Sequence, residues 1–148
     1  MKKKVEEFRK RFGLAVNLAA YQKYDEVKES CGFKPSQLFL TVMEYSYSKL
    51  SESSFRDSIK RFVAYDNLKD CLTETLTGKK QYNSFCHFVF YVSAEQYKAF
   101  CDCAKKLRTP QSALFTQALY AHWATLPNNE TVMKETLAKV AKIESLLN

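Results

Sequence analysis

Two short stretches with an apolar side chain at every second position constrain this sequence more than any other feature. The alternating residues are Phe12, Leu14 and Val16 in the first stretch and Phe88, Phe90 and Val92 in the second. A period of two is typical of a β-strand that buries one face. Because a single strand cannot satisfy its own backbone hydrogen bonds, we expect the two stretches to pair with each other, antiparallel, over one core.

The strands begin two copies of a longer repeat. Shifting the sequence by 76 residues places apolar residues on apolar residues without a gap over roughly 39 positions, for example Tyr21 on Tyr97. In each copy a polar residue able to cap a helix, Asn17 or Ser93, follows the strand. Apolar residues at three- and four-residue spacing then predict a helix.

A turn and a second helix complete each copy. The turns read "GFKPS" and "RTPQS". Gly32 suits the C-terminus of the first helix, Pro35 and Pro110 suit the first turn of the next, and Thr109 suits an N-cap. The second helices, "SQLFLTVMEYSYSKL" and "SALFTQALYAHWATL", are apolar on most sides, so we expect them to be buried.

Composition favours a mainly α fold. Of the 148 residues 46% are hydrophobic, while three Gly and three Pro are too few for a loop-rich β-sandwich. We predict a two-stranded antiparallel ribbon with four core helices, plus connecting and C-terminal helices. The expected units are a basic arm at 1–10, a first repeat at 11–50, a helical connector at 51–85, a second repeat at 86–127 and a C-terminal amphipathic helix at 128–148.

The connector and the C-terminal segment both show helical spacing of apolar residues. We expect the connector helix to be interrupted at Asp66-Asn67 and to end near Gly78, with Asp66 as solvated surface charge. The apolar stripe of the last helix consists of Met133, Leu137, Val140, Ile143 and Leu147. Such a stripe either docks on the core or binds a second copy of the chain.

The sequence does not carry the residues that catalysis or metal binding requires. Cys101 and Cys103 are two apart on a predicted helix, so their thiols point in different directions and cannot readily share a metal. No Gly-rich phosphate loop or nucleophile elbow is present. We therefore expect no enzyme activity, no metal and no cofactor, and we expect His122 to be a satisfied residue at the core or its rim.

The number and spacing of the cysteines indicate the cellular compartment. The five Cys follow no regular framework and are expected to be reduced thiols of a cytoplasmic protein. No apolar run approaches the length of a transmembrane helix, so no membrane partner is expected.

The order of strand, helix, turn and apolar second helix resembles the MetJ/Arc-like ribbon-helix-helix superfamily of DNA-binding proteins. The resemblance covers about residues 11–50 and 86–127, and a chain with both copies is similar to some accessory DNA-binding proteins of conjugative plasmids. It implies a tandem ribbon-helix-helix fold that binds double-stranded DNA and regulates transcription, as in a plasmid or other mobile element. In this superfamily the outer ribbon face enters the major groove, and the starts of the second helices bind phosphates.

The resemblance also implies site residues. The groove-facing residues would be Arg11, Gly13, Ala15, Asn17, His87, Val89 and Tyr91, and the phosphate-binding residues Lys34, Ser36, Gln37, Thr109, Gln111 and Ser112. Gly13, Ala15 and Val89 depart from the polar residues usual on this face, because apolar groups cannot hydrogen-bond a base edge. The alternative is a ribbon face used as a protein-interaction module, antitoxin-like or an assembly adaptor, including a relaxosome accessory protein.

The charge distribution favours an anionic partner. The formal net charge is +7 and the pI about 9.1. The basic residues of the N-terminal arm are Lys2, Lys3, Lys4, Arg9 and Lys10. The arm either binds phosphates or is a solvated terminus. A homo-oligomer, through the C-terminal helix or by exchange of strands between chains, is a further expectation.

Overall fold

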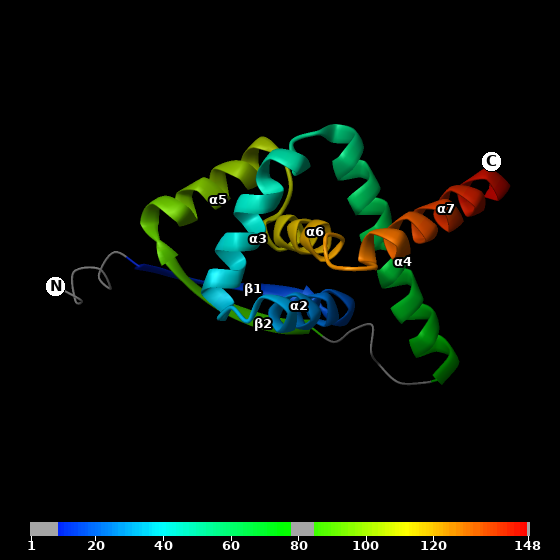
Figure 1. Cartoon of the computed structure of the whole chain (residues 1–148), viewed down its shortest axis with the longest axis horizontal. Coiled ribbons are helices and arrows are strands. Elements are labelled where there is room, and N and C mark those ends of the chain that lie inside the picture. The colour runs from blue at the N-terminus through cyan, green and yellow to red at the C-terminus, as the bar shows by residue number, and fades with distance from the viewer. Residues whose placement is uncertain (1–8, 78–84, 148) are drawn as a thin grey trace.

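The computed structural model describes residues 9–77 and 85–147, which are mainly helical (75%) with six helices and one two-stranded antiparallel sheet (Figure 1). The elements are β1 (Arg9–Asn17), α2 (Leu18–Cys31), α3 (Pro35–Leu50), α4 (Ser53–Thr77), β2 (Phe85–Ser93), α5 (Ala94–Lys106), α6 (Gln111–Trp123) and α7 (Asn129–Leu147). The predicted class, a mainly α chain with one antiparallel ribbon, is confirmed. None of the helices in the described ranges is long and apolar enough to cross a membrane.

The ribbon is centred on Gly13, which lies opposite Val89. These are also two residues that the 76-residue shift superimposes, so a pseudo-twofold axis relating the strands passes between them. Alternate residues on each strand face the helices, as the period of two predicts. The buried residues of the ribbon are Phe12, Leu14, Val16, Phe88, Phe90 and Val92.

Helices α3 and α6 form the buried centre. Phe39 of α3 and Phe115 of α6 are almost inaccessible to solvent, and their ring centroids lie 5.5 Å apart. Both rings also contact Phe90 of the ribbon, at 4.9 and 5.5 Å. The two helices approach closely enough for Ser46 Oγ to donate to the carbonyl oxygen of Ala118 at 3.0 Å. Each buried aromatic side chain contributes roughly 1.5–3 kcal/mol, so these rings hold the ribbon against the helices.

The helix ends follow the sequence except at α6. Asn17 caps α2 by accepting from the amide of Ala20, and Ser93 forms a capping box on α5. Gly32 ends α2 in the left-handed conformation, at φ 69°. The expectation of an N-cap at Thr109 is wrong, because Pro110 is the N-cap of α6 and the Thr109 hydroxyl donates instead to the carbonyl of Leu107 at 3.0 Å.

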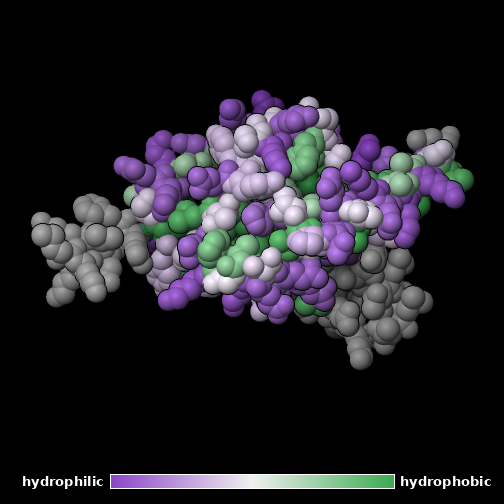
Figure 2. Space-filling model, viewed as in Figure 1, coloured by the Kyte–Doolittle hydropathy of each residue, from purple (hydrophilic) through white to green (hydrophobic). Residues whose placement is uncertain are grey.

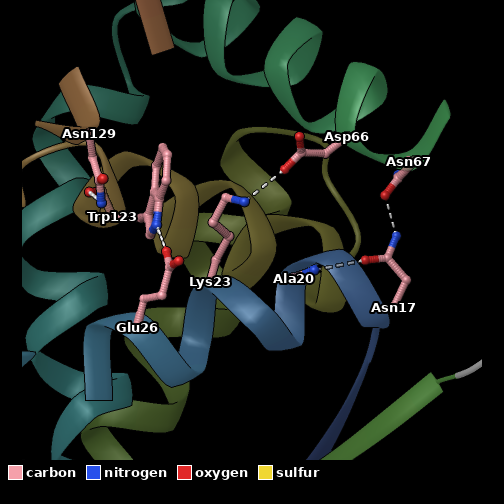
Figure 3. A network of polar contacts seen from close by, with 8 residues as sticks. All are labelled: Asn17, Ala20, Lys23, Glu26, Asp66, Asn67, Trp123 and Asn129. Atoms are coloured by element: carbon pink, nitrogen blue, oxygen red, sulfur yellow. Dashed lines mark hydrogen bonds and ion pairs between the residues drawn. The ribbon is translucent and has the colours of Figure 1, made fainter. Parts of the chain in front are cut away.

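Helix α4 runs through Asp66 and Asn67 without the predicted interruption. Asp66 is only 9% exposed, which also overturns its assignment as solvated surface charge. Its Oδ2 lies 3.1 Å from Nζ of Lys23 on α2, and Asn67 accepts a hydrogen bond from the side-chain amide of Asn17 (Figure 3). These two partners compensate for the low helix propensity of Asp and Asn, so tertiary contacts override the local preference.

Helix α7 packs on α4 and contacts the core only through its first half. Met133 and Leu137 touch the core, and Arg61 of α4 pairs with Glu144, 3.5 Å from Nε to Oε1. None of the residues described in α7 is buried. Its C-terminal end extends past the core in Figure 1, and apolar atoms are visible there in Figure 2. Among the side chains described in α4 and α7, the exposed large apolar residues are Leu68, Val132, Ile143, Leu146 and Leu147.

Candidate nucleic-acid interface

The outer face of the ribbon brings together six of the residues expected there. The cross-strand pairs are Arg11 with Tyr91, Gly13 with Val89, and Ala15 with His87. Val89 is 40% exposed and Tyr91 49%, so neither lies beneath another described segment. The alternation that buries the even positions of both strands therefore leaves a continuous accessible face on the other side.

The polar groups of this face lie toward its two ends. Arg11 and Tyr91 are opposite each other near one end, and the imidazole of His87 is exposed toward the other. The centre is apolar, because Gly13, Ala15 and Val89 carry no hydrogen-bonding side chain. A partner can therefore form hydrogen bonds to side chains at the ends and only van der Waals contacts at the middle.

The start of α3 lies beside β2. Ser36 Oγ accepts a hydrogen bond from the backbone amide of Tyr91 at 2.9 Å. Lys34 is the N-cap of α3 and its side chain makes no capping bond. The first amides of the helix are therefore left without a side-chain acceptor, and with the exposed Lys34 and Gln37 they form a positive end suited to an anion.

The start of α6 lies beside β1, at the pseudo-twofold position. Ser112 borders a cleft whose other wall includes Ala15 and Asn17. Gln111 donates its side-chain amide to Sγ of Cys101 at 3.2 Å, and Thr109 is buried. Of the three residues expected to contact phosphate here, Ser112 is the one that faces this cleft.

The structure places other predicted contact residues in different roles. Asn17 accepts from the amide of Ala20 and donates to Asn67, so its side chain caps α2 and anchors α4 (Figure 3). Lys10 lies on the core side of the ribbon, with Nζ 5.3 Å from the ring centroid of Tyr97. Arg9 begins β1 rather than ending an arm. Lys2, Lys3 and Lys4 lie outside the described residues.

Cys103 is buried, whereas Cys31, Cys86, Cys101 and His122 are half-buried. Among the described residues no group of three or more metal-ligating side chains is close enough to hold an ion. Burial raises the pKa of the Cys103 thiol, which disfavours the nucleophilic thiolate. Burial, with Lys49 nearby, lowers the pKa of His122. Its Nδ1 has no hydrogen-bond partner, so the expectation of a satisfied His122 is wrong.

Sequence reasoning missed Gln117 near the start of α6. It lies in the second turn of α6 and lines the cleft next to Ser112, together with Lys60 of α4. Gln117 has no signal in the sequence, because the cleft forms only where a helix from the connector lies over the ribbon. Comparison of the whole chain with known proteins found no matching family model, curated protein or solved structure.

Proposed function

We propose that this protein binds double-stranded DNA with the outer face of the β1–β2 ribbon, as two ribbon-helix-helix units in one chain. The observation that carries the proposal is the pseudo-twofold ribbon with an uncapped helix start beside each strand. The major groove is wide enough to admit a two-stranded ribbon. The starts of α3 and α6 would then approach the phosphates on the two sides of the groove.

Different side chains are suited to the bases and to the phosphates. Arg11 is suited to the acceptor edge of guanine, Tyr91 and His87 supply further polar groups, and Val89 fits a thymine methyl group. Phosphate contacts come from Lys34, Ser36 and Gln37 at one helix start and Ser112 at the other. By resemblance the role is transcription control, of a plasmid or other mobile element, in a reducing cytoplasm where free thiols persist.

The test is recovery and sequencing of genomic duplex fragments bound by the whole chain at low and moderate salt. We expect an enriched sequence that survives the added salt. Arg11→Ala should weaken binding to that sequence by about 1–3 kcal/mol and relax the preference at one position. Lys139→Ala, which removes one exposed positive charge from α7 far from the ribbon in sequence, is the matched control and should have little effect.

A different result would overturn the proposal. Binding that enriches no sequence, disappears with salt and weakens equally in Arg11→Ala and Lys139→Ala would reflect the positive charge of the chain alone.

A second function is favoured by the apolar centre of the ribbon face. The exposed Val89, beside Gly13 and Ala15, is suited to an apolar protein surface, as in an antitoxin-like module or an assembly adaptor, including a relaxosome accessory protein. Val89→Lys separates the two functions. It should weaken a protein contact, because a charge is placed in an apolar interface, and it should maintain or strengthen DNA binding.

We also propose that the chain binds a second copy of itself. Leu68 of α4 and three residues of α7, Ile143, Leu146 and Leu147, are exposed to solvent, which suits the same surface of a second copy. Sedimentation of the chain should show a dimer, and Leu146→Glu with Leu147→Glu should shift it to the monomer. A chain that is already monomeric at high concentration would contradict this contact.

A further inference from the structure

The two repeats make matching contacts with the ribbon, but their helices pack against each other differently. The 76-residue shift relates α2 to α5 and α6 to α3. Helix α2 packs closely against α6, whereas the related helices α5 and α3 make few close approaches. A groove of about 350 Å³ lies between α3 and α5.

Helix α4 covers the closely packed pair. The ring of Phe62 on α4 lies against the rings of Tyr120 and Trp123 on α6, with centroids 5.4 and 5.5 Å away. Asp66, about one turn further along α4, pairs with Lys23 of α2 (Figure 3). One face of a helix therefore contacts both α2 and α6.

The groove between α3 and α5 is the pseudo-twofold image of that covered surface. The shift relates three residues that α4 contacts to three residues of the groove lining: Tyr120 to Glu44, Trp123 to Tyr47 and Lys23 to Ala99. All three lining residues are exposed, and in Figure 1 α5 lies on the side of the molecule away from α4. The described part of the chain therefore covers this surface in one repeat and leaves it open in the other.

The lining of the groove is suited to the apolar face of a helix. Its walls include Leu40 and Met43 of α3 and Phe100 and Cys103 of α5. Glu44 is the only charged residue among those described in the lining, and it forms no ion pair with another described residue. The groove is therefore complementary to a partner that carries a positive charge beside an apolar face.

The contacts of α4 also indicate which residues such a partner carries. Moved onto the groove by the pseudo-twofold relation, Phe62 meets Glu44 and Tyr47, so a basic residue fits at its position. An arginine there can pair with the carboxylate and stack on the ring. Asp66 meets Ala99 in place of a lysine, so an apolar residue fits at its position.

We infer that the groove between α3 and α5 binds an amphipathic helix of another protein, with an arginine that pairs with Glu44. Residues at three- and four-residue spacing on one helix face commonly bind such a groove. The bound helix contacts α3 and α5 as α4 contacts α6 and α2. Two copies of the groove cannot pair with each other in a closed dimer, because both are concave and acidic. The groove shares no residue with the outer face of the ribbon, so binding there does not depend on the proposed function.

The test measures binding of fluorescein-labelled peptides to the whole chain by fluorescence anisotropy. The probe has the sequence of residues 53–68 of α4 with Phe62→Arg and Asp66→Leu, and the reference is the same peptide without these changes. We expect saturable binding of the probe, roughly tenfold tighter than that of the reference. Glu44→Gln in the chain should weaken the probe by about threefold, the effect of one exposed ion pair, and leave the reference unchanged.

Two tyrosines of α3 provide a matched pair of variants. Tyr47 lines the groove and is 47% exposed, whereas Tyr45 is 38% exposed and lies outside it. Tyr47→Ala should weaken the probe by about tenfold, as expected for an aromatic side chain at the centre of an interface, and Tyr45→Ala should not. Because both side chains are exposed, both variants should unfold at nearly the temperature of the unchanged chain.

Two outcomes would overturn the inference: absence of saturable probe binding, or equal binding by chains with Tyr47→Ala and Tyr45→Ala. A chain whose self-association in sedimentation is lost in Tyr47→Ala would assign the groove to a second copy and overturn the separate partner. The titrations contain no DNA, and none of the variants lies on the ribbon. Failure here is therefore distinguishable from failure of the ribbon to bind DNA.

Discussion

Neighbouring residues of β2 have opposite environments, and this difference fixes which face of the ribbon is inside. Phe90 is fully buried and its ring contacts those of Phe12, Phe39 and Phe115. Tyr91, the next residue, is 49% exposed. Because the side-chain period of a strand is two, a slip of one residue in the pairing would exchange these environments.

This pair of residues gives a stability prediction. Phe90→Ala should lower the free energy of unfolding by about 3–5 kcal/mol, because it leaves a cavity among aromatic rings. Tyr91→Ala should change it by about 0.5 kcal/mol or less, because the ring is exposed and the amide that bonds to Ser36 remains. Urea unfolding of both variants measures the difference. Equal losses would contradict the observed register.

His122 gives a prediction for pH dependence. Its pKa is lowered below the ordinary value of 6.5, first by burial and then by Lys49. On acidification the unfolded chain therefore binds the proton before the folded chain does, and stability falls as the pH drops below about 6.5. Urea midpoints at about pH 7 and pH 5 should differ less in His122→Gln than in the unchanged chain. The same pH dependence in both would exclude His122 as its source.

Residues were predictable where a single chemical property decides their place. The alternation of Phe, Leu and Val identifies the six buried residues of the ribbon. Asp66 was not predictable, because its burial depends on Lys23, which approaches it only in the folded chain. The place of Gln117 was not predictable either, since it lines a cleft with residues of α4 that are distant in sequence.

Among the elements, α4 connects the two repeats and also contacts α2. Lys23 of α2 lies between Asp66 of α4 and the indole of Trp123 on α6, with Nζ 4.6 Å from the ring centroid (Figure 3). The Trp123 indole donates to Glu26, also on α2. Three helices therefore meet around one half-buried ammonium group, which links α4 to α2 and α6.

Removal of this ion pair should destabilise the fold. Asp66→Ala leaves the largely buried Lys23 with only its ring contacts, and we expect a loss of about 2 kcal/mol, less than for a fully buried pair. Asp57→Ala removes an exposed acid from the same helix and should be close to neutral. Chemical denaturation compares the two variants. A neutral Asp66→Ala would show that the pair does not hold α4 in place.

The elements themselves were largely predictable, but their junctions and mutual contacts were not. Periodicity indicated both strands and the helices that follow them, and Gly32 marked the end of α2. The continuity of α4 was missed because Asp and Asn favour turns locally. The cleft beside Ser112 was missed because the repeat predicts equal halves, while α4 covers only one of the two helix starts.

The whole molecule contains both strands of its ribbon, so folding requires no second chain. The variant with Leu146→Glu and Leu147→Glu, in which the proposed contact between copies is removed, separates this fold from an intertwined dimer. We expect its urea midpoint to be independent of protein concentration, since a dimer with exchanged strands would become more stable as concentration rises. A midpoint of this variant that rises with concentration would favour strand exchange.

The pairing of Gly13 with Val89 at the centre of the ribbon has a geometric consequence. A ribbon made by two identical chains presents the same residues from either end, so its ligand can be turned around without any change of contacts. Here one end presents Arg11 and Tyr91 and the other presents Ala15 and His87. The two ends of this face therefore offer different contacts, so the two directions of a ligand along it are not equivalent.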